Sequence, residues 1–301
     1  MSLNWHALTN FSDKLYMFIC GMEARTENER LTLSRVNGNP TIGAGFDLVA
    51  GDEPVRKAVL KGMGFHFIEN SDNTNISTSQ DIEDGYAESL KNLMRNGIAD
   101  INQYNRILQE RHDNTDPAYA ALVPIGDRRT TFSFHNDAEV REVFDNLWED
   151  VYKNRVLNLL PAGSMDDAAL INSKEIIVLA SLGWNNADLI GPSLREAIRQ
   201  GNRAEAWFEI RYNSNSTRQS ANIRAGIAKR RFMESQVFGL YDDPQEVSAA
   251  EAQNIFRMLQ NHRQKIMEYE TEFGHAPDTD SPTNDRIAAA NHDYTTIIDL
   301  A

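Results

Sequence analysis

The stretch Asn37–Leu48, NGNPTIGAGFDL, decides how the front of this 301-residue chain folds. Its Asn37-Gly38 pair predicts a tight β-hairpin turn, because both residues tolerate a positive φ and the resulting twist suits antiparallel strands. Before the turn, Leu31–Val36 alternates apolar and polar residues, which predicts a strand with one exposed face. After the turn, Thr41–Phe46 predicts the returning strand.

Two glycines, Gly43 and Gly45, interrupt this returning strand, and Asp47 follows where the strand should end. A glycine inside a strand indicates a bulge, or a surface that another backbone or a ligand approaches closely. The stretch alone leaves two interpretations open. It is either a structural hairpin whose Asp47 caps the next element, or a tight surface that sets a hydroxyl and an acid beside a ligand.

Composition narrows the function classes. At 41% hydrophobic residues, the chain can bury a core for one large domain or two small ones. Its formal net charge of −14 argues against general nucleic-acid binding, which needs a basic footprint. No apolar run is long enough to span a membrane. The N-terminus lacks the pattern of a secretory signal, so we expect synthesis in the cytoplasm.

The histidines and the cysteine do not form a metal-binding motif. The seven histidines are scattered without the spacing of metal ligands, so we expect no metal and no other cofactor. The single cysteine, Cys20, excludes an internal disulfide, and its apolar surroundings predict a buried thiol in a helix.

Helical periodicity covers most of the remaining chain, apart from a polar segment at about 70–127 that reads as a helical insertion. With the one hairpin, this predicts an α+β fold that is predominantly helical. Ser193 with Glu196, and Asn202 with Glu205, have the spacing of helix N-caps. The predicted helices are Phe11–Ala24, a short one that Gly51–Pro54 starts and Gly62–Gly64 stops, one from Asp137 to about Pro161, Lys174–Leu182, Leu194–Gln200, Arg203–Tyr212, Asn222–Phe238 and Ala249–Phe273.

The order of the motifs resembles phage lysozymes of the T4 lysozyme class. Glu23 ends an apolar helix, the TIGxG hairpin follows, and a late helix carries RAGIAKRRFME at Arg224–Glu234. The resemblance covers about Asn10–Tyr241 without the insertion. It implies a lysozyme-like, two-lobed fold with a small N-terminal sheet and a helical C-terminal lobe. The catalytic domain would be residues 1–241, followed by a helical extension and polar tail at 242–301.

One departure from phage lysozymes is informative. Those proteins usually carry their catalytic aspartate before the TIG motif, where this chain has no acid. The acid follows instead, as TIGAGFDL, which resembles the pesticin branch of bacterial toxins. That resemblance implies a catalytic set of Glu23, Thr41 and Asp47, although Glu27 and Glu29 stand close to Glu23.

The chemistry that the resemblance implies is glycoside hydrolysis, which ordinarily needs two carboxyl groups. Glu23 would be the general acid, because burial beside apolar groups helps a carboxyl keep its proton. Glu27 and Glu29 lie in a polar link that we expect to be solvated. Asp47 and Thr41 would orient the attacking water, which favours inversion at the anomeric carbon. Gly43 and Gly45 would let a sugar ring approach the strand.

Two further substrate-binding candidates lie later in the chain, and each has a structural alternative. Arg230, with Arg231, either belongs to a solvated basic helix face or forms a patch that meets the carboxylates of peptidoglycan peptides. Trp184 either stacks on a sugar or belongs to the core.

The resemblance thus implies a muramidase that cleaves the bond between N-acetylmuramic acid and N-acetylglucosamine in bacterial peptidoglycan. The toxin-like motif favours an antibacterial effector that is delivered to the periplasm or cell wall. Its partners would then include an immunity protein or a secretion component. The alternatives are a lytic transglycosylase, a phage endolysin, and a non-catalytic glycan-binding or interaction module on a lysozyme fold.

Overall fold

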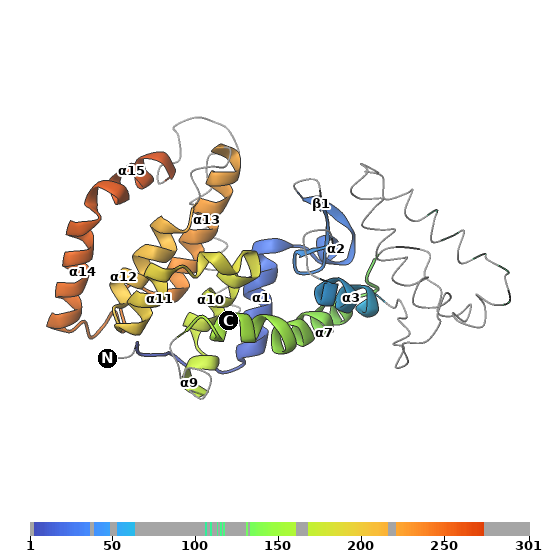
Figure 1. The fold of residues 1–301 in the computed structure, drawn as a ribbon, viewed down its shortest axis with the longest axis horizontal. Helices are drawn as coiled ribbons and strands as arrows, with labels where there is room; N and C mark the ends of the chain where they lie inside the picture. Colours follow the sequence, from blue (N-terminus) through green and yellow to red (C-terminus); the bar gives the residue numbers. More distant parts are fainter. Residues whose placement is uncertain are drawn as a thin grey trace, which may run out of the picture. The chain divides into compact units, whose positions relative to one another are not determined.

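The computed structural model describes residues 3–36, 39–48, 53–63, 131, 133–160, 168–215 and 221–273, with the single positions 106, 109, 113, 115 and 117. These residues are mainly helical with one small antiparallel sheet (Figure 1). The predicted α+β, mainly helical class is therefore confirmed. The Asn37-Gly38 turn, most of the insertion at about 70–127 and the tail after residue 273 lie outside the described residues.

The chain divides into two compact units. The first, here called the sheet unit, is Ile19–Trp148, and the second, the helical unit, combines Met1–Phe18 with Glu149–Ala301. The division falls within α1 (Phe11–Glu23) and at the start of the π-helix η2 (Trp148–Tyr152). The domain boundary expected at residues 241 and 242 stays a prediction.

The sheet unit contains three antiparallel strands in the order β1 (Ser34–Val36), β2 (Asn39–Ile42) and β3 (Phe46–Asp47). The prediction of one returning strand over Thr41–Phe46 was wrong. Gly43 and Gly45 adopt φ values of +65° and +80°, which reverse the chain between β2 and β3. Glycine reaches these values without steric cost, so the glycines make a second tight turn instead of thinning a strand.

Helices α2 (Glu27–Leu31) and α3 (Glu53–Gly62) pack against this sheet, and α7 (Asp137–Leu147) packs against both helices. Helices α3 and α7 begin close to the predicted positions. Helix α2 occupies the predicted polar link, and it takes the start of the predicted strand. Thr26 is the N-cap of α2 and forms a capping box with Glu29. The Thr26 hydroxyl accepts a hydrogen bond from the Glu29 backbone N–H, and the Glu29 carboxylate accepts one from the Thr26 backbone N–H.

The core of the sheet unit forms where α3 packs on β3 and α7, while α2 packs on β2 and α7. Phe134 belongs to this core and is 3% exposed. The Phe134 backbone N–H donates to the carbonyl of Leu31 at 3.0 Å, which ties the chain after the insertion to the end of α2. Elements from both sides of the insertion therefore share one core.

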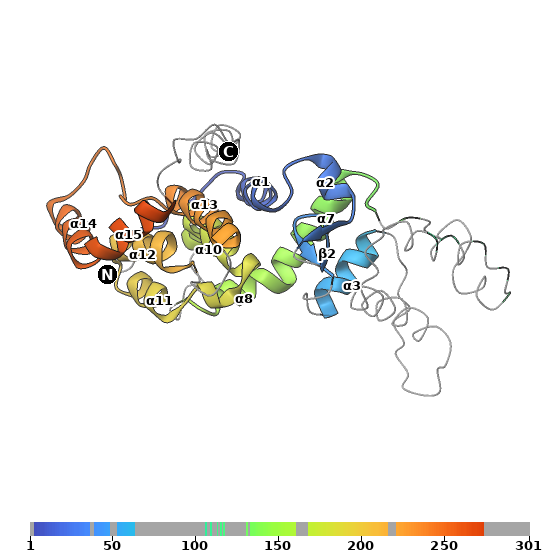
Figure 2. The same cartoon turned by 90° about the horizontal axis from the view of Figure 1, so that it is seen from above.

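The helical unit is built around α10 (Lys174–Asn185). Residues Glu175–Trp184 of this helix are all buried, so it has no exposed face over those turns. It packs against other helices of the unit (Figure 2). The other elements are α8 (Lys153–Leu157), α9 (Ala168–Ile171), the 3₁₀ turn η4 (Ala187–Leu189), α11 (Pro192–Arg199), α12 (Arg203–Phe208), the π-helix η5 (Glu209–Asn213), α13 (Ala221–Phe238), α14 (Ala249–Asn261) and α15 (Arg263–Phe273).

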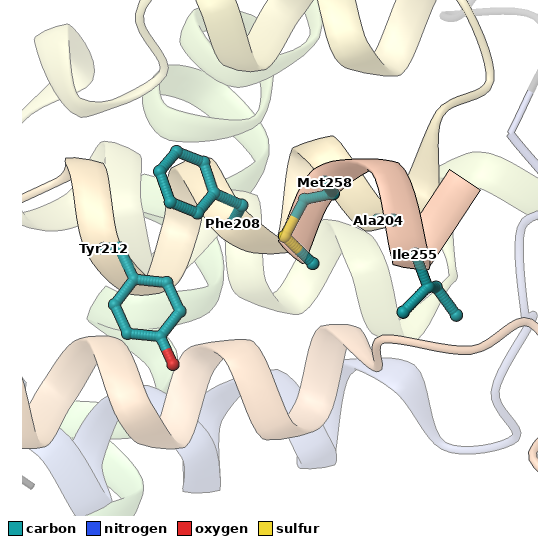
Figure 3. Close-up of a cluster of buried hydrophobic side chains, with 5 residues drawn as sticks. All are labelled: Ala204, Phe208, Tyr212, Ile255 and Met258. Atoms are coloured by element: carbon teal, nitrogen blue, oxygen red, sulfur yellow. The ribbon is translucent and has the colours of Figure 1, made fainter. Parts of the chain in front are cut away.

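The last predicted helix, Ala249–Phe273, is two helices, because His262 adopts φ −109° and ends α14. The His262 ring stacks on Phe208 of α12 with 3.7 Å between centroids, which fixes the break. Helix α14 packs on α12 (Figure 1). Figure 3 shows the buried cluster that α12 and the following π-helical turn, which carries Tyr212, form with α14: Ala204, Phe208, Tyr212, Ile255 and Met258.

The two predicted caps had different outcomes. Asn202 caps α12, with its side-chain oxygen accepting from the Glu205 backbone N–H at 3.2 Å, as predicted. The Ser193 cap was wrong, because α11 begins two residues before the predicted start, at Pro192, with Gly191 at the N-cap. No helix among the described residues is long and apolar enough to cross a membrane.

Candidate active site

Glu23 and Gly45 lie in direct contact within the sheet unit. Glu23 is the last residue of α1 and is partly buried. A Cβ added to Gly45 would lie 2.9 Å from the Cβ, the Cγ and Oε2 of Glu23. Because Gly45 has no side chain, the Glu23 side chain can pack directly against the glycine turn.

Thr41 and Asp47 are directly opposite each other on β2 and β3. Both are partly buried, whereas their neighbours Ile42 and Phe46 are buried on the opposite face of the sheet. Side chains at directly paired positions have Cβ atoms about 4.5–5.5 Å apart and share one face. The hydroxyl of Thr41 and the carboxylate of Asp47 are therefore neighbours, as the glycine turn requires.

Ser34 extends this pair into a row across all three strands. It is the β1 partner of Thr41, and its hydroxyl donates to the Thr41 carbonyl oxygen at 3.1 Å. Sequence analysis did not single out Ser34. The signal was present, because a two-residue loop at Asn37-Gly38 pairs residue 36 with 39 and so pairs Ser34 with Thr41.

Arg30 joins the helix end to the glycine turn. Its guanidinium donates to the carbonyl of Ala24, the residue after Glu23, at 3.2 Å. The same group donates to Oδ1 of Asp137 at the start of α7, at 2.5 Å. The Arg30 backbone carbonyl accepts from the Gly43 N–H at 3.0 Å. One residue, which sequence analysis missed, thus holds the segments that carry Glu23, Thr41 and Asp47.

Glu27 and Glu29, the alternatives to Glu23, are both exposed on α2. Glu29 is committed to the cap of that helix, because its Oε2 accepts from the Thr26 backbone N–H at 2.9 Å. This backbone hydrogen bond lowers the pKa of Glu29 below its ordinary value. A carboxyl that holds its proton less readily is a poor general acid near neutral pH, so Glu29 is poorly suited to that role, and the choice of Glu23 stays a prediction.

Gly43 serves the packing of Phe46. A Cβ at Gly43 would lie 2.6 Å from Cδ2 of the Phe46 ring, so glycine is required here for the ring to reach the core. The expectation that Gly43 and Gly45 let a sugar approach the backbone stays a prediction. At Gly45 the side that a Cβ would occupy is filled by Glu23.

For Arg230 and Arg231 on α13, the first alternative, a solvated basic helix face, was wrong. The Arg231 side chain is fully buried and pairs with Glu234 at 2.5 Å, while the Arg230 side chain is 12% exposed. The Arg230 guanidinium donates to Oε1 of Glu234 at 3.2 Å and to the Ser181 carbonyl of α10 at 3.0 Å. Arg230 therefore joins α13 to α10, and its contact with substrate carboxylates stays a prediction.

Trp184 lies at the end of α10 in the helical unit. It is 9% exposed, and its ring stacks on Tyr152 with 4.1 Å between ring centroids. The structural alternative, a core aromatic, accounts for this position without any ligand. Stacking of Trp184 on a sugar stays a prediction.

The sheet unit brings the Glu23 side chain against Gly45, and it pairs Thr41 with Asp47 on the two strands that the glycine turn joins. Asp47 follows Gly45 by two residues, which keeps its Cα within about 7 Å of the glycine that Glu23 contacts. Among the described residues, no group of three or more His, Cys, Asp or Glu is placed to hold a metal ion. Comparison of the chain with models of protein families, with curated proteins and with solved structures gave no match.

Proposed function

We propose that this chain is a muramidase, which hydrolyses the β-1,4 bond between N-acetylmuramic acid and N-acetylglucosamine in peptidoglycan. The observation that carries the proposal is the convergence of Glu23, Thr41 and Asp47 at one glycine turn. Two carboxyl groups and a hydroxyl are the set that water-mediated glycoside hydrolysis needs.

In this mechanism, Glu23 donates its proton to the glycosidic oxygen as the bond to the anomeric carbon breaks. Asp47, ionised, accepts a proton from the water that attacks that carbon from the opposite face. The Thr41 hydroxyl holds the same water, because it lies on the same face as Asp47. Since Asp47 activates a water in this mechanism and forms no covalent bond to the sugar, the product is expected to have inverted configuration.

The lysozyme-like, two-lobed fold is part of the proposal, and the division into a sheet unit and a helical unit supports it. Peptidoglycan lies outside the inner membrane, so the protein must be delivered to its substrate. A secreted effector that is controlled by an immunity protein in the producing cell fits the toxin-like motif. A partner that abolishes hydrolysis would be its signature.

The test is digestion of purified peptidoglycan, followed by mass spectrometry of the products. It compares the wild type with Glu23→Gln and Asp47→Asn, and uses Glu27→Gln as the matched control because Glu27 is an exposed neighbour outside the cap. Loss of general acid–base catalysis should slow the first two variants by about 10²–10⁴-fold. Glu27→Gln should retain the wild-type rate.

The products also separate the alternatives. Reducing N-acetylmuramic acid ends support the muramidase. Anhydro-muramic ends, with an active Asp47→Asn variant, would identify a lytic transglycosylase, which needs no second carboxylate. A folded wild type that binds glycan strands and releases no products would identify a non-catalytic glycan-binding module.

A further inference from the structure

The helical unit contains a cavity of about 600 Å³ that the proposed hydrolysis does not use. Its walls come from the N-terminal segment and α1, from the start of α10, from α12, and from the end of α13 with the chain that follows. Apolar side chains dominate the lining, among them Phe18, Ile177, Trp207, Val237 and Leu240. A concave apolar site of this size is typical of small-molecule binding sites.

The charged groups in the lining are all of one sign. Lys14 and Lys174 line the cavity, and the described residues that line it include no Asp or Glu. This is unexpected in a chain with 44 acidic and 30 basic residues. The charged residues that line the cavity are therefore basic, although the protein is acidic.

The two lysines lack the partners that cations in a partly buried wall usually have. Within the described chain, neither ammonium group makes a hydrogen bond or an ion pair. The neighbouring Glu175 and Asp242 are both engaged by Arg203, at 2.9 and 3.0 Å. Burial lowers the pKa of Lys174 below its ordinary value, since desolvation disfavours its charged form. A bound anion would offset that cost.

We propose that this cavity binds a single-chain amphiphile, with its apolar body among the side chains of α1, α10 and α13 and its anionic head group on Lys14 and Lys174. The shared chemistry of the head group is a carboxylate, phosphate or sulfate. Such a ligand matches both features of the site. Burial of a hydrocarbon chain against the apolar walls is favourable, and the ammonium groups can donate charge-assisted hydrogen bonds to an anion.

The experiment is isothermal titration of the full chain with dodecanoate below its micellar concentration. Acetate carries the head group alone, and dodecyltrimethylammonium carries the same chain with the opposite charge. Dodecanoate should bind once per chain, whereas acetate and the cation should not bind. Lys14→Gln and Lys174→Gln should each weaken dodecanoate binding roughly tenfold. The control variant, Lys61→Gln, removes an exposed lysine of α3 that does not line the cavity, and it should bind as the wild type does.

A second readout locates the ligand without altering a charge. Trp207 lines the cavity, so dodecanoate should change the tryptophan fluorescence of the wild type and not that of Trp207→Phe. The proposal is overturned if dodecanoate fails to bind or if the cation binds equally well. It is also overturned if both lysine variants retain wild-type affinity, or if only vesicles of anionic phospholipid bind.

Discussion

Gly45 packs directly against the side chain of Glu23, and a Cβ added to Gly45 would lie 2.9 Å from Oε2 of Glu23. The φ of +80° at Gly45 adds a second reason for glycine, because other residues adopt this conformation at a cost of roughly 1–2 kcal/mol. The same position therefore shapes the turn and seats the proposed acid. A substitution there tests both.

We expect Gly45→Ala to lower the free energy of unfolding by about 1–3 kcal/mol, through backbone strain and the clash with Glu23. Hydrolysis should fall further than stability explains, because the Glu23 side chain must move. Urea denaturation and the peptidoglycan assay, both at a temperature where the variant is folded, measure the two effects. Full activity in a destabilised variant would mean that the position of Glu23 does not matter.

Gly226→Ala is the control for Gly45→Ala, and we expect it to have the opposite effect on stability. Gly226 lies inside α13, is exposed, and has no atom within 4 Å of the place that a Cβ would take. Replacing glycine by alanine in a helix interior should raise the free energy of unfolding by about 0.5–1 kcal/mol. Urea denaturation checks this, and hydrolysis should not change. Destabilisation here would remove the contrast on which the Gly45 prediction rests.

Thr41→Val tests the hydroxyl beside Asp47, because valine keeps the branched shape and loses the oxygen. The turnover rate should fall roughly tenfold, as expected for one lost hydrogen bond to a reacting water. Ser34→Ala is the matched variant. It removes the next hydroxyl in the same row, whose hydrogen bond is to the Thr41 carbonyl, and it should reduce turnover much less. Equal losses would point to sheet stability instead of water positioning.

Most helices and the position of the hairpin follow from the sequence, because amphipathic spacing and the asparagine–glycine pair are local signals. The second turn was misread because glycine within an apolar run predicts a thinned strand as readily as a reversal. Only the φ values of Gly43 and Gly45 separate the two, and they depend on where Phe46 and Glu23 must pack. That packing involves residues far apart in the sequence.

The contacts of the site that the sequence did not reveal are also long-range. Arg30 reads as one charge in a polar link, yet it contacts Asp137 across 107 positions of the chain. Likewise, the basic pattern around Arg231 allowed a solvated face as one of two alternatives, and the structure buries this residue against Glu234. A charge pattern on one helix cannot show which neighbour covers it.

Arg30→Lys should loosen the link between the Glu23 helix end and the glycine turn. A lysine ammonium cannot bridge the Ala24 carbonyl and the Asp137 carboxylate as the wider guanidinium does. We expect a loss of about 1–3 kcal/mol in the free energy of unfolding. We also expect a lower turnover rate in the folded enzyme, because Glu23 and Asp47 lose their common support.

The control for this change is Arg141→Lys in the same unit. Arg141 makes an i,i+4 ion pair with Asp145 on α7, and both side chains are partly exposed. Surface pairs of this kind contribute up to about 0.5 kcal/mol, so stability and turnover should stay close to wild type. If the two arginine variants behaved alike, Arg30 would have no special role.

Through Tyr212, we expect the stability of the helical unit to depend on pH in the alkaline range. Burial raises the pKa of this tyrosine above its ordinary value, and its hydroxyl donates to Oε1 of Glu270 at 2.8 Å. In the unfolded chain, tyrosine ionises near pH 10, whereas folded Tyr212 stays protonated there. The unfolded state therefore loses a proton first, and the free energy of unfolding should fall as pH rises above about 10.

Tyr212→Phe should be about 1 kcal/mol less stable at pH 8, where it lacks the hydrogen bond. Urea denaturation at pH 8 and pH 10.5 should show a smaller decline for the variant than for the wild type, and an equal decline in both would place the alkaline sensitivity elsewhere.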